Sequence, residues 1–434
     1  MRVAVIGGGV AGLSAAWLLG KRADVTLFEA EPRLGGHART IEVSVDGVTA
    51  PVDTGFLVFN RRTYPHLCGL FDHLDVPLAP SAMTFSVSVD SGRLEWAGSN
   101  LATLFAQARN LARPAFWSML ADIVRFNTRA RAAVRDSAAE PTLGEFLDSE
   151  RFGEPFRRWY LLPMAGAIWS CPTASMLEYP LGQFCRFFDN HGLLQLVDRP
   201  QWYTVAGGSR EYVARLASLF PHCVAHAVTR VLPGPFGVEA VADGARYQFD
   251  QVVLACHADQ ALRLLEAPST DEASVLGAIR YQPNRAIVHT DRNLLPRRRS
   301  VWSAWNYITD SDELSDRPVG VSYLINKLQP VPFDSPVIVT LNPPREPAPE
   351  RVLDAFEVEH PLFDRGAVEA QARLSTIQGV RRLWFCGAWT GNGFHEDGIR
   401  SAVAVANALG VYAPWQPVQA RPAARPATAL ADVR

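Results

Sequence analysis

A glycine-rich loop between a short apolar strand and a helix constrains the fold of this chain more than any other feature. Residues 3–6 are continuously apolar, as in the buried strands of parallel sheets. The next six residues, 7–12, are GGGVAG and match the pattern G-x-G-x-x-G. Residues 13–19 favour a buried helix, and residues 25–29 favour a second strand that ends in Glu29. This order of strand, glycines, helix, strand and acid predicts a dinucleotide-binding βαβ unit.

Each part of this unit has a predicted role at a dinucleotide. Gly7 permits the tight turn, Gly9 lets a pyrophosphate approach the backbone, and Gly12 lets the helix pack closely on the strand. The helix N-terminus faces the phosphates with free N–H groups and the positive end of its dipole, and Val10 and Ala11 of the preceding loop are expected at the cofactor. Glu29 accepts hydrogen bonds from a ribose diol and would repel a 2′-phosphate, which disfavours NADP.

The residues after Glu29 distinguish FAD from NAD. Residues 29–40 are EAEPRLGGHART. This segment resembles the E-A-x-x-R-x-G-G-R-x-x-T segment of the flavin-containing amine oxidase superfamily, which includes monoamine oxidases, phytoene desaturases and protoporphyrinogen oxidases. The resemblance implies that FAD lies against Glu29, Ala30, Arg33, Gly35, Gly36 and His37. His37 stands where the family has an arginine, and it either only contacts the cofactor or takes part in the chemistry.

Later segments extend the resemblance over nearly the whole chain. They are the D-x-G segment near residue 55, the G-G turn at 207–208, the strands near 228 and 254, and the signature at 383–399. The further residues that the resemblance places at FAD are Gly55, Phe56, Val228, Ala255, Gly387, Ala388, Asp397, Gly398 and Ile399. Asp397 and Gly398 are expected at a helix start, where free N–H groups either bind the flavin pyrimidine or are simply capped by the aspartate.

These segments predict an α/β fold with a discontinuous Rossmann-type FAD-binding domain at 1–80, 200–265 and 375–413. The inserts 81–199 and 266–374 are predicted to form a mixed α+β substrate domain with an antiparallel sheet, and 414–434 a disordered tail. Helical periodicity covers 101–112 and resumes after Pro114, whereas the second insert has strand patterns at 286–290, 302–307, 319–325 and 337–340. Trp305, Tyr307 and Trp389 are candidates for the substrate cavity, with core packing as the alternative.

The count of basic residues bears on the chemistry. The chain has 434 residues and a formal net charge of -2, with 40 Arg and only two Lys, Lys21 and Lys327. In amine oxidases of the superfamily a lysine often approaches flavin N5 through a water. The corresponding strand here, 283–291, has Arg285 and His289 but no lysine. The sequence therefore disfavours amine oxidation.

Composition also excludes several classes of protein. The near-neutral charge argues against a nucleic-acid partner. No apolar run reaches the roughly 18 residues of a membrane span, and the opening strand leaves no room for a signal peptide. The six cysteines are scattered without a C-x-x-C pair, which predicts no metal site and favours a reducing cytoplasm.

Three segments resemble a narrower group. Residues 55–60 with Tyr64 and Pro65, residues 255–260 and residues 393–398 are similar to flavoproteins encoded beside, or fused to, cyclopropane-fatty-acid synthases. The resemblance implies an apolar or lipid substrate, with desaturation or oxidation of an acyl chain, including a methyl-modified chain of a phospholipid, by hydride transfer to flavin N5. It also raises a lipid methyltransferase as a partner. The arginines of the first insert are either solvated or form a peripheral contact with anionic lipid.

His395 and Glu396 are the candidates for proton transfer, because they are close in sequence to the flavin-binding turn, and the alternative is a structural role. Only one G-x-G-x-x-G is present, so we expect the substrate to reduce the flavin and oxygen, a quinone or a carrier to reoxidise it. The other functions that remain open are an amine or amino-acid oxidase, a polyene desaturase of the carotenoid type, and a non-catalytic FAD-binding partner of a lipid methyltransferase.

Overall fold

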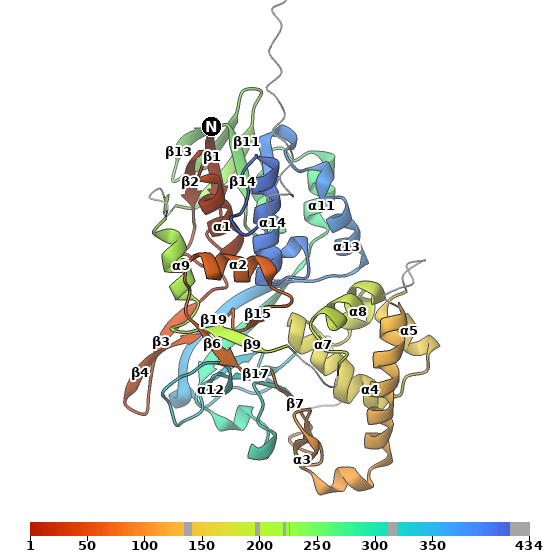
Figure 1. Cartoon of the computed structure of the whole chain (residues 1–434). Helices are drawn as coiled ribbons and strands as arrows, with labels where there is room; N and C mark the ends of the chain where they lie inside the picture. Colours follow the sequence, from red (N-terminus) through yellow and green to blue (C-terminus); the bar gives the residue numbers. More distant parts are fainter. Residues whose placement is uncertain (134–140, 196–199, 220–222, 225, 311–318, 417–434) are drawn as a thin grey trace, which may run out of the picture.

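The molecule has a parallel sheet at one end and a mostly antiparallel sheet at the other. The computed structural model describes residues 1–133, 141–195, 200–219, 223–224, 226–310 and 319–416. Figure 1 shows the parallel sheet at the end that carries the N-terminus, and a group of helices beside the second sheet at the opposite end. This arrangement confirms the predicted α/β class with a Rossmann-type unit and an antiparallel sheet.

Three segments of the chain that lie far apart in sequence build the parallel sheet. Its strands, in spatial order, are β10 (Cys223–Val224), β2 (Asp24–Phe28), β1 (Arg2–Ile6), β14 (Gln251–Leu254) and β20 (Leu383–Phe385). Successive side chains of β1 enter different cores, since Val3 and Val5 belong to one cluster and Ala4 and Ile6 to another. Both faces of the sheet are therefore covered, as the continuous apolar run predicted.

Helices cover one face of the parallel sheet, and a small sheet with further helices covers the other. The first layer contains α1 (Val10–Leu19), α2 (Pro65–His73), α9 (Arg210–Ala217) and α14 (His395–Ala408). The second contains β11 (Val228–Pro233), β12 (Val238–Ala242), β13 (Ala245–Phe249), α10 (Ala258–Leu264), α11 (Thr270–Gly277) and α13 (Arg365–Ala372). None of the helices in the described part of the chain is long and apolar enough to cross a membrane.

Both inserts contribute strands to the second sheet. Its order is β19 (Val352–Pro361), β15 (Tyr281–His289), β18 (Ile338–Leu341), β17 (Val321–Leu324), β16 (Trp305–Thr309), β7 (Phe85–Val89) and β8 (Leu94–Ala97). All neighbours are antiparallel except β16 and β7. Smaller elements connect it to the rest: β3 (Thr40–Val45), β4 (Val48–Asp53), β5 (Phe59–Asn60), β6 (Leu78–Ser81), β9 (Trp202–Val205) and α12 (Ile325–Leu328).

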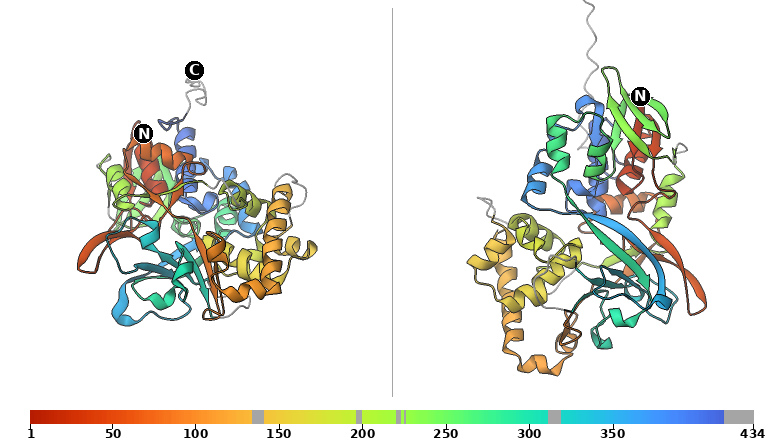
Figure 2. Two further views of the ribbon diagram at one scale, coloured as in Figure 1. Left: turned by 60° about the horizontal axis from the view of Figure 1, so that its bottom comes forward. Right: turned by 180° about the vertical axis from the view of Figure 1, so that it is seen from behind.

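The helices of the first insert bury an aromatic core beside this sheet (Figure 2). They are α3 (Leu101–Leu104), the 3-10 turn η1 (Ala108–Ala112), α4 (Pro114–Ala133), α5 (Leu143–Ser149), α6 (Glu154–Phe156), α7 (Leu162–Trp169) and α8 (Leu181–Asn190). Phe184 and Phe188 stack with ring centroids 4.2 Å apart, and both side chains are fully buried. Edge-to-face and offset pairs of this kind add to the stability given by burial alone.

Four expectations need correction. The helix expected over 101–112 is broken into α3 and η1, because Asn100 caps one turn and the buried Gln107 and Asn110 bind the β7–β8 hairpin. The mainly helical first insert also supplies β7 and β8, and the second insert contains the missed strand β19. The predicted tail begins too early. Trp415 stacks on Trp17 at 5.8 Å and donates to His66, while residues 417–434 lie outside the described part. The exact domain boundaries stay a prediction.

One buried carboxylate joins the two ends of the molecule. Asp53, at the end of β4, accepts hydrogen bonds from the Thr40 hydroxyl, from the Ser209 N–H and hydroxyl, and from the Gln329 amide. Burial raises its pKa to about 6, although these donors oppose the shift. Because its partners come from β3, from the turn before α9 and from the residue after α12, Asp53 ties the cofactor segments to the second insert.

Candidate functional site

In the glycine-rich loop the backbone segments approach each other closely at Gly12, as predicted, and the space beside Gly9 is open. A Cβ atom on Gly12 would stand 1.8 Å from the Gly7 carbonyl oxygen, so no other residue fits there without moving the loop. A Cβ on Gly9 would meet nothing within 4 Å. Gly9 precedes the first residue of α1, where free N–H groups and the helix dipole favour an anion. The loop therefore leaves room for a phosphate at the predicted place.

The segment after β2 folds back over this loop. The Gly35 N–H donates to the Gly8 carbonyl at 2.8 Å, and Gly35 forms a bridge with Gly9. Glu29 accepts hydrogen bonds from the N–H groups of Gly8 and Glu31, at 2.5 and 2.8 Å. The Arg33 guanidinium donates to the Gly36 carbonyl, and Ala30 is exposed beside Glu29. The structure thus brings the predicted ribose and pyrophosphate residues together around Gly9.

The C-terminal signature reaches the same loop. Gly398 in α14 lies against α1, with its Cβ position 3.0 Å from a Val10 methyl, and Ile399 is fully buried beside it. The Gly387 N–H donates to the Ser401 hydroxyl, which places Gly387 and Ala388 at the first turns of α14. Helix α14 begins at His395, so Asp397 is its third residue and not the expected start. The Asp397 carboxylate folds back on the N–H groups of Asn392 and Phe394 and pairs with Arg400.

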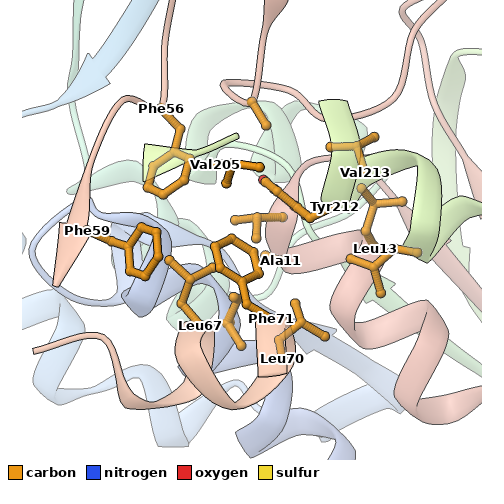
Figure 3. Packing of buried hydrophobic residues seen from close by; sticks show 14 of the residues in the cluster. Ala11, Leu13, Phe56, Phe59, Leu67, Leu70, Phe71, Val205, Tyr212 and Val213 are labelled. Atoms are coloured by element: carbon orange, nitrogen blue, oxygen red, sulfur yellow. The ribbon is translucent and has the colours of Figure 1, made fainter. Parts of the chain in front are cut away.

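His395 is half-buried against aromatic rings. Its ring stacks on Phe56 with centroids 3.9 Å apart, and its Nε2 is 3.2 Å from the Tyr212 hydroxyl. Burial lowers the pKa of His395 to about 3, so the imidazole is neutral at pH 7. Figure 3 shows Phe56 and Tyr212 among the packed side chains next to Ala11 of α1. The structure therefore brings His395, Phe56 and the start of α1 into one region, while Gly55 lies against the His37 backbone.

Glu396 holds a neighbouring helix. Its two carboxylate oxygens accept hydrogen bonds from the N–H groups of His66 and Leu67, at 3.0 and 2.9 Å, in the first turn of α2. Burial raises the pKa of Glu396 to about 7, against the lowering effect of these donors. A cavity of about 530 Å³ opens beside it, lined in part by Arg62, His191 and Phe394. Glu396 thus combines a structural contact with a pKa suited to proton transfer near neutral pH.

Three histidines from separate segments meet beside the loop after Gly36. His37 lies 6.0 Å from His257 and 5.5 Å from His360 between ring centroids. His257 stacks on Tyr281 at 4.4 Å, and its Nδ1 is 3.6 Å from the Glu359 carboxylate. Burial lowers the pKa of His37 to about 4 and that of His360 to about 3; the nearby His257 lowers both further, and His37 adds to the shift of His360. The His37 Nε2 is buried without a hydrogen-bond partner in the structure, as expected of a group that meets a ligand.

A chain of amides fixes the protonation of His360. The Asn342 oxygen accepts from the Arg285 backbone N–H, so its amide nitrogen faces Asn284 and donates to that oxygen at 2.6 Å. The Asn284 nitrogen then donates to the Gln282 carbonyl and to Nδ1 of His360 at 2.9 Å. An Nδ1 that accepts leaves the proton on Nε2. His360 is therefore a neutral Nε2–H donor.

The remaining candidates have mainly packing contacts. Val228 begins β11 and is buried, and Ala255 lies against Gly7 at the end of β14. Trp389 is buried in the core under the parallel sheet, and its N–H is 3.3 Å from the Cys256 carbonyl. Tyr307 is buried in the aromatic core, whereas Trp305 is half-buried, meets Tyr323 edge to face, and keeps an unpartnered buried N–H. Of the three cavity candidates, Trp305 is the one that is partly exposed and keeps an N–H without a partner.

Both lysines of the chain lie away from this region. The Lys21 ammonium stands over the Trp17 ring after the end of α1, and Lys327 is exposed on α12. On β15, Arg285 pairs with Glu346, and His289 is fully buried between Thr340 and the Asp291 N–H. No cationic side chain of β15 among those described is directed at the cofactor loop.

Known proteins resemble this chain in sequence. The family of flavin containing amine oxidoreductases matches residues 10–323. The chain belongs to this family. It is 34% identical over 170 residues to a carotenoid phi-ring synthase of Streptomyces griseus, and the match spans 35% of this chain and about a third (32%) of the synthase.

Solved structures of the family share the fold. A fatty acid isomerase of P. acnes that produces CLA has a TM-score of 0.66 at 15% identity, and covers 92% of this chain and 96% of its own. Cyclohexylamine oxidase of Brevibacterium oxydans IH-35A has a TM-score of 0.67 at 17% identity, and the match covers 94% of this chain and 99% of the oxidase. The protein is an FAD-dependent oxidoreductase, and the open space at Gly9 together with the unpartnered His37 nitrogen fits FAD.

Two parts of this region were not predicted from the sequence. Asp53 was noted only as part of a segment, and its partners Ser209 and Gln329 are too distant in sequence for any pattern to join them. His360 lies on the missed strand β19, whose alternation of Asp354, Phe356, Val358 and His360 on one face was a usable strand signal.

Proposed function

We propose that this flavoenzyme desaturates or oxidises a lipid acyl chain, a class that includes the methyl-modified chains of phospholipids. The observation that carries the proposal is the placement of the only two lysines, because neither Lys21 nor Lys327 is near the cofactor loop. A lysine-dependent amine oxidation is thereby disfavoured. Two relatives, a fatty acid isomerase and a carotenoid synthase, have names that concern apolar chains and support the same substrate class.

The chain's own residues have the following proposed roles. FAD, when bound, accepts a hydride at N5. The α1 N-terminus and Gly9 hold the pyrophosphate, Glu29 the ribose, and α14 from His395 to Ile399 the flavin pyrimidine. His37 and His360 present neutral imidazoles to the cofactor, and the half-buried Trp305, with its unpartnered N–H, faces the substrate.

His395 and Glu396 stay the candidates for the proton that leaves with the hydride. The neutral His395 has Nε2 at the Tyr212 hydroxyl, and Glu396 has a pKa of about 7 at the edge of a cavity. Loss of a hydride and a proton from adjacent carbons leaves a double bond, and dioxygen, a quinone or an electron carrier removes the electrons. Because unactivated C–H bonds resist hydride transfer, we expect a substrate with a neighbouring alkene or another activating group.

Anaerobic mixing of the FAD-loaded protein with candidate substrates tests the proposal. We expect an acyl phospholipid to bleach the yellow flavin and amines or amino acids to leave it unchanged. Bleaching by amines alone would overturn the proposal, and bleaching by a polyene alone would favour the carotenoid-type alternative. If no lipid bleaches the flavin and the protein binds tightly to a lipid methyltransferase, the non-catalytic partner role replaces it. We propose a cytoplasmic location, with contact at the membrane surface.

A further inference from the structure

Two parts of the substrate domain that are distant in sequence form one apolar and basic surface. Its apolar members are Leu101, Leu111 and Trp117, with side chains 75%, 54% and 50% exposed. Phe105 connects them, since its N–H donates to the Leu101 carbonyl and its ring lies 5.4 Å from that of Trp117. The Trp117 indole N–H donates to the Leu111 carbonyl at 2.9 Å. Exposed large apolar side chains gathered in this way mark an interaction site more often than chance does.

Arginines surround these side chains. Arg109 donates to the Arg93 carbonyl. The pKa of Arg113 is lowered first by burial and then by repulsion from the guanidiniums of Arg109 and Arg93. The second insert adds Arg297, whose side chain lies against Gly92, and Arg299, which stands 5.6 Å from the Trp302 ring. We call the set of Leu101, Leu111, Trp117, Arg93, Arg109, Arg113, Arg297 and Arg299 the anchor surface.

Of the arginines in the anchor surface, Arg93 pairs with Asp90. Glu95 and Asp310 pair with Arg298 and Arg345, which lie outside the set. Asp122, further along α4 than Trp117, pairs with Arg125 at 3.1 Å. Within the described ranges, which leave out 311–318, no carboxylate is in ion-pair distance of Arg109, Arg113, Arg297 or Arg299. The described part of the surface therefore has an excess of positive charge.

The anchor surface is held firmly to the β7–β8 hairpin and lies at one end of the molecule. Gln107 and Asn110, 2% and 0% exposed, bind Gly92 and Glu95 of the β7–β8 hairpin and hold η1 in place. Figure 1 shows α3 and the start of α4 at the end of the molecule farthest from the N-terminus. A projecting end can meet a flat surface without obstruction from the rest of the molecule.

We propose that the anchor surface docks the protein on an anionic lipid bilayer. Tryptophan and leucine side chains enter the interface, and the guanidiniums bind lipid phosphates. The inference deepens the proposed function and rests on it, because an enzyme for phospholipid acyl chains needs access to a bilayer. Vesicle binding itself requires no turnover, so the two proposals fail separately.

Co-sedimentation with vesicles tests the docking. We expect the FAD-loaded protein to sediment with phosphatidylglycerol–phosphatidylcholine vesicles, to release at high salt, and to stay in solution with phosphatidylcholine alone. The double variant Arg109→Glu/Arg113→Glu should weaken binding by about fivefold or more for each arginine replaced. Leu111→Ser/Trp117→Ser should weaken it about tenfold.

Matched variants at the opposite end serve as controls. Phe236→Ser removes an apolar side chain that is 93% exposed, and Arg230→Glu/Arg246→Glu reverses two exposed charges on β11 and β13. Both should bind as the unaltered protein does, and all variants should keep their FAD and their circular dichroism. Equal vesicle binding by surface and control variants would overturn the proposal. The proposal would also be overturned if the unaltered protein did not bind anionic vesicles. This holds equally if the same residues bind a protein partner instead.

Discussion

The cofactor end and the substrate end of the molecule are organised by different kinds of contact. Around α1, backbone meets backbone: Gly12 lies on the Gly7 carbonyl, and Gly35 donates to Gly8. In the first insert, side chains meet side chains, as where Phe184 packs on Phe188 and Trp169. Backbone contacts demand glycine at fixed spacing, whereas an aromatic core tolerates many arrangements. The difference explains why the cofactor end is conspicuous in sequence and the substrate end is not.

The largest effect is expected from Gly12→Ala. The added Cβ would stand 1.8 Å from the Gly7 oxygen, so the variant should lose about 3 kcal/mol or more of stability and its FAD. Thermal unfolding and the FAD content per chain measure both losses. The control Gly366→Ala, on the exposed first turn of α13, should keep its FAD and its stability. If the Gly12→Ala protein is stable and contains FAD, close backbone packing does not require glycine at this position.

Phe184→Ala should separate stability from cofactor binding. The side chain is fully buried between Tyr179, Phe126 and Phe188, and its truncation should cost about 3–5 kcal/mol. FAD content of the protein that stays folded should not change, because the cofactor end has a separate core. Chemical denaturation measures the cost, with the exposed Phe236→Ala as the control. Loss of FAD at full stability would contradict the separation of the two ends.

The variant Glu396→Gln tests a carboxyl group that lies between the cofactor end and the substrate end of the molecule. The folded-state pKa of Glu396, about 7, lies above the ordinary value of 4.5, so the folded protein binds the proton more tightly than the unfolded chain. Its contribution is therefore fully present below pH 4.5 and is lost as the pH rises through 7, by up to about 3 kcal/mol.

Unfolding measured from pH 4.5 to 8 should show this decline in the unaltered protein and a flatter profile in Glu396→Gln. Exposed Glu369→Gln should behave like the unaltered protein. Parallel profiles for all three proteins would show that Glu396 does not titrate in this range.

Gly9→Ala should have the smallest effect on the stability of the fold, and it should still weaken the binding of FAD. Its backbone angles, φ -72° and ψ -177°, suit alanine, and the added methyl meets no protein atom within 4 Å. The methyl would instead occupy space meant for the pyrophosphate, so FAD affinity should fall by about tenfold or more. FAD titration followed by fluorescence measures this, and unchanged affinity would show that the phosphate lies elsewhere.

Much of the cofactor site could be predicted from sequence, because Gly9, Glu29 and Gly36 follow one another at spacings that a dinucleotide dictates. The helix start at His395 was placed two residues late, since the folded-back Asp397 looks like a cap in sequence. The contacts of Asp53 with Ser209 and Gln329, and the amide chain to His360, depend on tertiary folding. The anchor surface needed the structure as well, because Arg297 of the second insert meets Gly92 of the β7–β8 hairpin only in the folded protein.

The central claim is that an FAD-dependent enzyme without a lysine at its cofactor acts on lipid acyl chains. The most direct measurement is mass spectrometry of phospholipids incubated with the FAD-loaded protein and an electron acceptor. The account predicts acyl chains that have lost two hydrogen atoms or gained oxygen, and no conversion of amines in the same mixture. Unchanged acyl chains together with oxidised amines would contradict it.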